Sequence, residues 1–316
     1  MPYFLLKRAA TFLATLVAAS ILIFLVLEIL PGNPARVILG PDAPESAVEA
    51  LAHKLGADRP PLDRYLDWIG GLLEGDLGTS YAYGTPVGEI VGERLAVSLP
   101  LAILAMALTA ALALSAGVFA AARHDTAGDF GVMALSQLGI AVPSFWLAIL
   151  LILFFAVELR WVSAGGFPGW SAGFWTAIKA LILPAVALAA VQAAILARIT
   201  RSAVLEVSRE DFVRTARAKG LSKGKTLRRH VLRNAMIPIV TVMGLQFANL
   251  IAGAIVVENV FYLPGLGRLM FQSIANRDIA VIRDVVMLLA GMVVLVNFAV
   301  DLLYAAIDPR LRAEDA

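Results

Sequence analysis

The sequence predicts an all-α, polytopic membrane protein with six transmembrane helices. Of its 316 residues, 60% are hydrophobic and only 16% are charged, whereas soluble domains carry roughly 25% charged residues. This composition, with a mean hydropathy of +0.82, excludes a disordered chain and disfavours a soluble enzyme. The apolar residues form six charge-free runs of the length that crosses a bilayer as helices. The runs are Ala9–Leu27, Ala96–Ala122, Gly131–Val157, Ala180–Ala197, Asn234–Val257 and Val285–Val300, the last continuing past Asp301 to Ile307.

Each run is expected to be a helix, because only a helix satisfies the backbone polar groups of an isolated span within lipid. The first run ends at Pro31-Gly32-Asn33-Pro34 without an A-x-A-like site directly after it, so we expect a permanent span rather than a removable signal peptide. Pro143 and Pro184 interrupt the third and fourth runs. Membrane bundles tolerate such prolines where neighbouring groups satisfy the freed carbonyls.

The distribution of charge predicts the topology. Of the 26 Lys and Arg residues, 16 lie on the side of the membrane that holds the N-terminus, whereas the 65-residue stretch 31–95 has 5 basic and 10 acidic residues. Basic residues mark the cytoplasmic side, so both termini are predicted to be cytoplasmic. The predicted divisions are an N-terminal transmembrane helix (1–30), an extracytoplasmic acidic cap (31–95), a five-helix core (96–307) with a cytoplasmic loop (204–233), and a cytoplasmic tail (308–316).

The outer segments have their own helical pattern. Apolar periodicity predicts helices in Glu45–Leu55 and Asp63–Leu73, separated by the breaker Arg59-Pro60-Pro61. Between the fifth and sixth runs, Tyr262–Gly267 predicts a turn before an amphipathic segment, Arg268–Ala275.

The cytoplasmic loop is expected to contain two short helices. Ser208 and Asp211 form a capping-box pattern that predicts a helix start, and Gly220 stands where a left-handed residue would end that helix. A second helical segment is expected from Ser222. Eight basic residues and no acid lie between Arg214 and Arg233. In a polytopic chain, such a basic loop is explained better by a cytoplasmic location and by attraction to anionic lipid headgroups than by nucleic-acid binding. Docking of a cytoplasmic partner is compatible with this explanation.

Gly220–Thr226 is similar to a phosphate-binding loop but has three residues between its glycines where that motif needs four, and no apolar strand precedes it. We therefore do not expect this chain to bind a nucleotide. The chain has no cysteine, and its histidines, His53, His124 and His230, lie in separate segments. No catalytic set, metal site or cofactor site is predicted, and a six-span conductor or scaffold is favoured over an enzyme.

Two amides are candidates for the translocation pathway. Gln246 and Asn249 are three residues apart in the fifth run, so they lie on one face of the predicted helix. An amide in lipid is expected to face other helices or a channel, and interhelical hydrogen bonding is an equal alternative. Glu28, Glu258 and Asp301 flank or interrupt runs, where interface anchoring and a pathway role are both open.

Several motifs together resemble the dipeptide/oligopeptide/nickel branch of ATP-binding-cassette importer permeases. In the cytoplasmic loop, Arg214-Thr215-Ala216 stands where the general family signature has E-A-A, whereas the whole stretch from Phe212 to Pro238 is similar to the branch form. The resemblance covers nearly the full chain. Its other motifs are Pro31–Pro34, Gly75–Ser80, Pro86-Val87, Pro143–Trp146, Glu258–Phe261, Pro264–Gly267, Arg277-Asp278, Asn297–Asp301, Tyr304 and Asp308-Pro309-Arg310.

The resemblance implies the type I importer permease fold in a bacterial-type inner membrane. The implied partners are a second homologous permease subunit, two cytoplasmic ATPase subunits that use ATP, and an extracytoplasmic solute-binding protein. The helix Ser208–Gly220 would then be the coupling helix that seats in an ATPase. Its implied contact residues are Phe212, Thr215, Ala216, Ala218, Gly220 and Leu221.

For the cargo, a short peptide is favoured over free nickel because no histidine lies in any predicted span. A nickel or glutathione importer remains the alternative within the branch. A secondary transporter or channel without an ATPase, and a membrane scaffold, are the alternatives of other classes.

Overall fold

The computed structural model describes residues 2–307 apart from 30–33, 41, 55 and 57. In this part of the chain the regular structure is helical, and the β contact recorded is an isolated bridge between Thr79 and Pro86. Five of these helices are long and apolar enough to cross a membrane, and a bent helix pair supplies a sixth crossing if it counts as one span. The predicted all-α class is confirmed.

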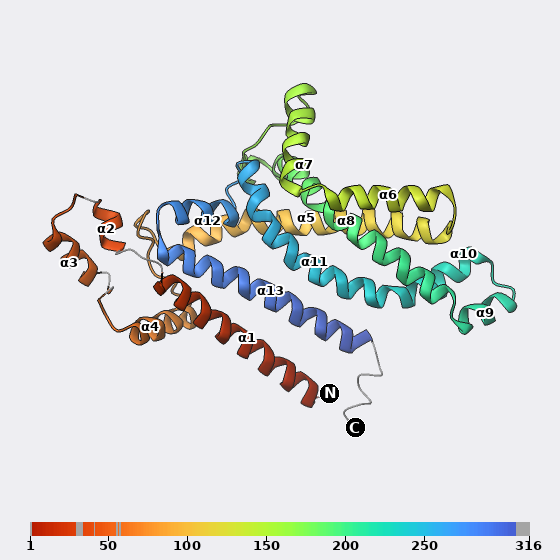
Figure 1. Ribbon diagram of the computed structural model, residues 1–316, viewed down its shortest axis with the longest axis horizontal. Helices are drawn as coiled ribbons and strands as arrows, with labels where there is room; N and C mark the ends of the chain where they lie inside the picture. The colour runs from red at the N-terminus through yellow and green to blue at the C-terminus, as the bar shows by residue number, and fades with distance from the viewer. Residues whose placement is uncertain (1, 30–33, 41, 55, 57, 308–316) are drawn as a thin grey trace.

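The five long helices run side by side along the longest axis of the molecule (Figure 1). α5 and α8 make the most extensive contact, α11 packs on α8, and α13 contacts both α11 and α1. The approach of α5 to α8 needs a glycine, because a Cβ at Gly117 would lie 2.6 Å from the carbonyl oxygen of Ala197. The helices are α1 (Pro2–Ile29), α5 (Val87–Ala122), α8 (Phe174–Ser208), α11 (Leu232–Val260) and α13 (Ile279–Ile307).

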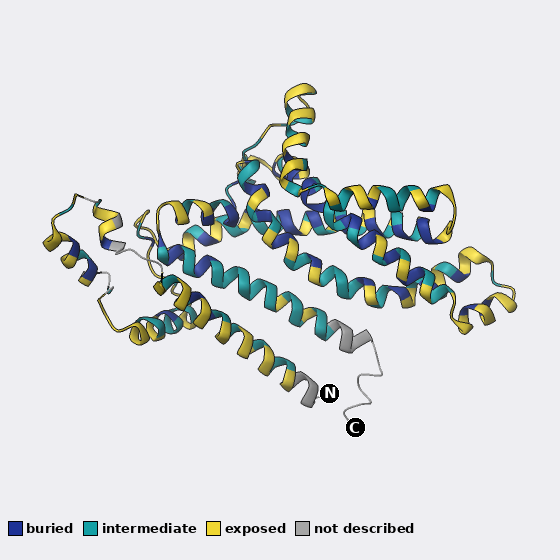
Figure 2. Cartoon of the chain, in the orientation of Figure 1, coloured by how far each residue is buried: buried dark blue, intermediate teal, exposed yellow. Residues whose placement is uncertain are grey.

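Buried residues concentrate on the central helices, whereas α1 is mostly exposed along its length (Figure 2). Leu13, Leu22 and Leu25 are among the exposed apolar residues of α1, as expected for a helix that faces lipid. Two contacts hold α1 on α13. The Arg8 guanidinium lies 2.8 Å from the Asp301 carboxylate, and the rings of Phe12 and Phe298 are 5.1 Å apart. Asp301 is therefore an anchor between two helices.

The third apolar run is not one continuous helix. α6 (Ala127–Ala141) and α7 (Ser144–Leu151) are bent by 98° at Val142-Pro143, and α7 continues as a π-helical segment, η1 (Ile152–Glu158). The predicted interruption of the run Gly131–Val157 at Pro143 is confirmed. Proline forces the preceding residue out of the helical region, and Val142 has an extended ψ of 120°. α7 consequently projects away from the other helices (Figure 1).

The segment that follows α1 folds into short helices at one end of the molecule (Figure 1). They are α2 (Pro34–Leu39), α3 (Glu45–Lys54) and α4 (Pro61–Glu74), so both helices predicted here are confirmed. α5 begins at Val87, so the predicted cap 31–95 includes the start of this span. The buried Trp68 of α4 donates its indole N–H to Asp284 of α13 at 2.7 Å, which fastens the cap to the spans.

Short helices join the later spans. At the end of the molecule opposite the cap, α9 (Asp211–Ala218), α10 (Lys223–Thr226) and the π-helical η3 (Leu227–Val231) connect α8 to α11. At the cap end, η2 (Trp170–Ala172) precedes α8, and α12 (Leu266–Ala275) connects α11 to α13. The predicted tail 308–316 and the motif residues 31–33 lie outside the described residues.

Candidate coupling site and polar anchors

α9 lies on the spans through one apolar face. Val213 and Ala216 are buried, and Val213 belongs to a cluster with Val204 of α8 and Val231 of η3. Phe212, four residues before Ala216, lies at the edge of this face and is 43% exposed, and the outer side of the helix carries exposed polar residues. α9 therefore packs on the spans of its own chain through apolar residues, and its outer face is exposed.

The six predicted coupling residues differ in exposure. Ala216 points into the protein and is 8% exposed, whereas Phe212 is 43% exposed. The residues that leave their side chains or backbone at the surface are Phe212, Thr215, Ala218 and Gly220, with Leu221 half-buried.

The C-terminal end of α9 has the predicted form, whereas its N-terminal end does not. Gly220 has a φ of +87°, which confirms the predicted left-handed residue at the end of the helix. The amides of Gly220 and Leu221 bond to the carbonyls of Arg217 and Ala216, which is a Schellman ending. The predicted capping box is wrong. Ser208 is the last residue of α8, and its hydroxyl donates to the carbonyl of Val204, so the short helix begins at Asp211 instead.

The segment that is similar to a phosphate-binding loop forms a helix cap. The Ser222 hydroxyl accepts the Lys225 amide at 3.5 Å, and α10 begins at Lys223. α10 continues through η3 into α11, so that Lys223–Val260 forms one long helical span. A phosphate loop would wrap successive amides around the ligand after a strand; here the chain proceeds directly into a helix.

A polar cluster links α6 to α8 near the α9 end. The Arg201 guanidinium binds both carboxylate oxygens of the buried Asp129, with Nε–Oδ1 at 2.5 Å and Nη2–Oδ2 at 2.7 Å. His124 Nδ1 lies 3.2 Å from Asp129 and 3.3 Å from Arg201 Nη2. A second link joins Arg198 to Gln137 of α6 at 3.2 Å.

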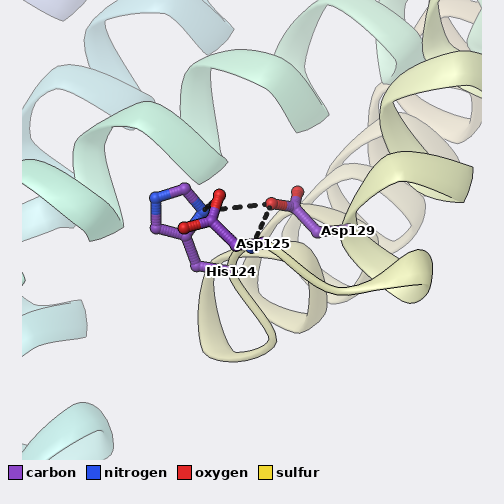
Figure 3. A group of neighbouring side chains, drawn as sticks. All are labelled: His124, Asp125 and Asp129. Carbon is purple, nitrogen blue, oxygen red and sulfur yellow. Dashed lines mark hydrogen bonds and ion pairs between the residues drawn. The ribbon is translucent and has the colours of Figure 1, made fainter.

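Figure 3 shows His124 and Asp129 of this cluster together with the neighbouring Asp125. Their ligand atoms lie within 4.8 Å of one another, a spacing that a metal ion would accept. The bidentate guanidinium of Arg201 already supplies the positive charge and occupies both Asp129 oxygens. We therefore interpret the cluster as an ion-pair anchor between two spans. Sequence reasoning missed it, although an acid so close to the start of an apolar run was a usable signal.

The two pathway candidates have different surroundings. Gln246 is 3% exposed and its amide donates to the carbonyl of Gln192 on α8 at 3.1 Å. Its Oε1 is buried without a partner among the described residues. Asn249 lies on the exposed surface of α11. The interhelical hydrogen bond weighed for Gln246 is present, and a pathway role for both amides stays a prediction.

At the cap end, a buried carboxylate organises the start of α12. Glu258 of α11 is fully buried and accepts the Ser98 hydroxyl of α5 at 2.5 Å and the Gly267 amide at 2.7 Å. Glycine is required at this turn, because a Cβ on Gly265 would lie 2.3 Å from the Glu258 carboxylate. The motif Pro264–Gly267 thus makes room for a carboxylate that joins three helices.

A second buried carboxylate organises the end of α12. Asp278 accepts the Ser80 hydroxyl at 2.5 Å, and its two oxygens accept the amides of Tyr81 and Ala82 at 3.2 Å each. Burial raises the pKa of the neighbouring Tyr81 phenol, so this side chain stays neutral. Both ends of α12 are therefore fixed by carboxylates. The sequence alone showed only that Glu258 lies near a span end, and Asp278 was noted only as part of the Arg277-Asp278 motif.

Comparisons with known proteins agree with this architecture. Residues 113–313 match the family described as binding-protein-dependent transport system inner membrane component, and residues 1–102 match its N-terminal family. A putative peptide transport system permease protein of Brucella abortus is 42% identical over 312 residues, covering 99% of each chain. The di/tripeptide transport system permease protein DppB of Pseudomonas aeruginosa is 38% identical, and the glutathione transport system permease protein GsiC of Escherichia coli is 40% identical, each with 98% of both chains covered.

A solved structure shares the fold. An inward-facing form of the MetNI methionine ABC transporter superposes with a TM-score of 0.59 and 20% identity, covering 69% of this chain and 96% of that one. This similarity supports the type I permease fold predicted from the motifs. The chain belongs to the family of binding-protein-dependent transport system inner membrane components, as a permease subunit of an ABC importer.

Proposed function

We propose that this permease subunit forms half of an import pathway for short peptides. The observation that carries the proposal is full-length identity of about 40% to permeases named for peptides, for di- and tripeptides and for glutathione, itself a tripeptide. Nickel is the remaining alternative within the branch. His53 and His124 lie outside the candidate spans, and His230 lies near the basic start of the span Lys223–Val260, so these side chains are not placed to line a path for the free ion through the membrane core.

The partners follow from the family. The pathway is completed by a second homologous permease subunit, cargo is delivered by an extracytoplasmic solute-binding protein, and two cytoplasmic ATPase subunits bind and hydrolyse ATP. This chain itself holds no cofactor and performs no hydrolysis. These partners are proposed because the chain belongs to a family of permease subunits, each of which is one component of an ABC importer.

Both termini are proposed to be cytoplasmic. The basic connection between α8 and α11 and the acidic cap lie at opposite ends of the long helices (Figure 1), which supports the charge rule. Because the chain has no cysteine, single cysteines at Ser46 and Ser222 can be labelled cleanly with a membrane-impermeant maleimide on intact cells. Labelling at position 46 alone is expected, and labelling at position 222 alone contradicts the orientation.

The exposed face of α9 is proposed to seat in an ATPase subunit. Phe212 presents a partly exposed aromatic ring, and Thr215 and Ala218 are also exposed; exposed aromatic residues commonly anchor protein interfaces. Ala216 is buried against the spans of this chain, so its proposed role is to hold α9 in position rather than to contact the ATPase.

Uptake by proteoliposomes tests the cargo. The assembled importer, with its solute-binding protein, is assayed for ATP-dependent uptake of a labelled dipeptide, glutathione and a nickel salt. Uptake of the dipeptide or of glutathione, absent when ATP is omitted, is the expected result. Uptake of nickel alone contradicts the peptide proposal. A Gln246→Leu, Asn249→Leu double variant with normal peptide uptake removes those residues from the pathway.

A further inference from the structure

A cavity of about 590 Å³ lies at the cap end of the spans, between the loop 160–168 and the start of α8. Its polar lining includes Arg160, Ser163, Thr176 and Lys179, and it contains no acidic residue. Among the described residues, neither Arg160 nor Lys179 has an ion-pair partner. Two unneutralised cations on one cavity favour an anionic occupant.

The local backbone adds to this preference. Thr176 and Lys179 lie in the first turns of α8, a helix that begins at Phe174, and the amides at a helix N-terminus attract negative charge. On the facing side, Arg160 has a left-handed φ of 55°. The amides of its neighbours Leu159 and Trp161 bond to the carbonyls of η1, which fixes Arg160 at the end of that helix.

Aromatic residues place the cavity at the boundary of the membrane. Trp161, which lines the cavity, is 64% exposed, and Trp175 in the first turn of α8 is 79% exposed. Exposed tryptophans gather at the level of lipid headgroups, because the indole has an apolar body and a polar N–H. The cavity therefore lies where phosphate groups of a bilayer lie.

An apolar surface continues from the cavity into the hydrocarbon layer. Phe155 of η1 contacts the ring of Trp161, with centroids 5.7 Å apart, and Leu153, Phe154 and Val157 of the same segment are exposed. A phosphate with acyl chains can use the cations and this surface together. Free phosphate can use only the cations.

We infer that Arg160 and Lys179 bind the phosphodiester of an anionic phospholipid, whose acyl chains lie along η1. Arginine binds phosphate through paired N–H donors, and lysine adds a point charge. The site would hold one lipid at the base of the projecting α7–η1 arm. Such a lipid stabilises the orientation of an arm that leaves the body of the protein at the 98° bend.

Native mass spectrometry of the assembled importer tests this inference. Samples are incubated with phosphatidylglycerol, phosphatidylcholine or inorganic phosphate, and retained molecules are counted. Wild type is expected to retain phosphatidylglycerol in preference to phosphatidylcholine and not to exchange it for phosphate. An Arg160→Gln, Lys179→Gln double variant should bind phosphatidylglycerol about 30-fold more weakly, because each basic residue contributes roughly a fivefold change near an anionic surface.

Arg277→Gln is the matched control. Arg277 is also an exposed arginine with a left-handed φ, 50°, at the same end of the spans, but it does not line the cavity. Its substitution should leave retention unchanged. Retention by the double variant equal to wild type, equal loss in Arg277→Gln, or displacement of the lipid by inorganic phosphate would each overturn the inference.

Discussion

α12 and α9 are short helices that join spans at opposite ends of the molecule, and they are held in different ways. α12 has a buried carboxylate at each end, Glu258 and Asp278, which accept hydrogen bonds from Ser98 and Ser80, far away in the sequence, and Glu258 also accepts the amide of Gly267 in α12 itself. In α9 the side-chain hydrogen bonds recorded, from Arg214 and Thr215 to Asp211, stay within the helix, and only an apolar face contacts the spans. The cap end is thus fixed internally, whereas the α9 end keeps its polar surface for a partner.

The strongest test of the fixed end is Gly267→Ala. A Cβ at this position would lie 2.2 Å from the Cα of Ile255, a backbone atom that cannot yield like a side chain. We expect a loss of about 3 kcal/mol or more in stability, at the upper end of overpacking effects. Thermal unfolding in detergent measures it. Gly291→Ala in α13 is the control, because a Cβ there meets nothing within 4 Å. Equal stability of the two variants would show that α12 is loosely seated.

Glu258→Ala should have the next largest effect. It leaves the Ser98 hydroxyl and the Gly267 amide without their buried acceptor, and each unsatisfied group costs about 1–3 kcal/mol. We expect a loss of about 2–3 kcal/mol, with Glu258→Gln losing less because its amide oxygen still accepts. Glu158→Ala, at an exposed position, provides the baseline. A Glu258→Ala variant as stable as Glu158→Ala would contradict the carboxylate anchor.

The α9 end also has a polar anchor, but it holds two spans rather than the connecting helix. Asp129→Ala leaves Arg201 without its bidentate partner. Because the Arg201 side chain is 22% exposed, we expect about 2 kcal/mol, less than for a fully buried pair. An Asp129→Ala, Arg201→Met double variant should regain part of this loss. Additive losses in unfolding experiments would mean that the two side chains do not interact.

Hydrophobic patterning predicted the spans well because each apolar run has one low-energy solution in lipid, a helix. It predicted the end of α9 for an equally local reason, since Gly220 tolerates the left-handed backbone that a Schellman ending needs. The prediction failed at Ser208 because capping depends on where the preceding helix ends. α8 continues through Ser208, which turns that hydroxyl back to Val204.

The anchors were beyond sequence reasoning for a different reason. Glu258 and Ser98 are 160 residues apart in the sequence, and only the packing of the helices brings them together. The sequence marked Glu258 as an unusual acid near a span end, yet it could not show that Gly265 and Gly267 leave the space in which the carboxylate sits. The same holds for Arg201 and Asp129, which lie on different spans.

The smallest effect on stability, and the most selective effect on function, is expected at Phe212. Its ring is exposed at the edge of the apolar face of α9, so Phe212→Ser should change the stability of the permease by less than about 0.5 kcal/mol. If the exposed face of α9 seats in an ATPase, loss of an aromatic anchor should reduce substrate-stimulated ATP hydrolysis about tenfold in the reconstituted complex. Val213→Ala gives the opposite pattern, since Val213 is buried against the spans, and should lower stability by about 1 kcal/mol. Ala216→Asp would mix the two effects, because this residue faces the protein's own spans. Normal stimulated hydrolysis in Phe212→Ser would remove the exposed face of α9 from coupling and would leave the contrast between the two connecting helices as one of stability alone.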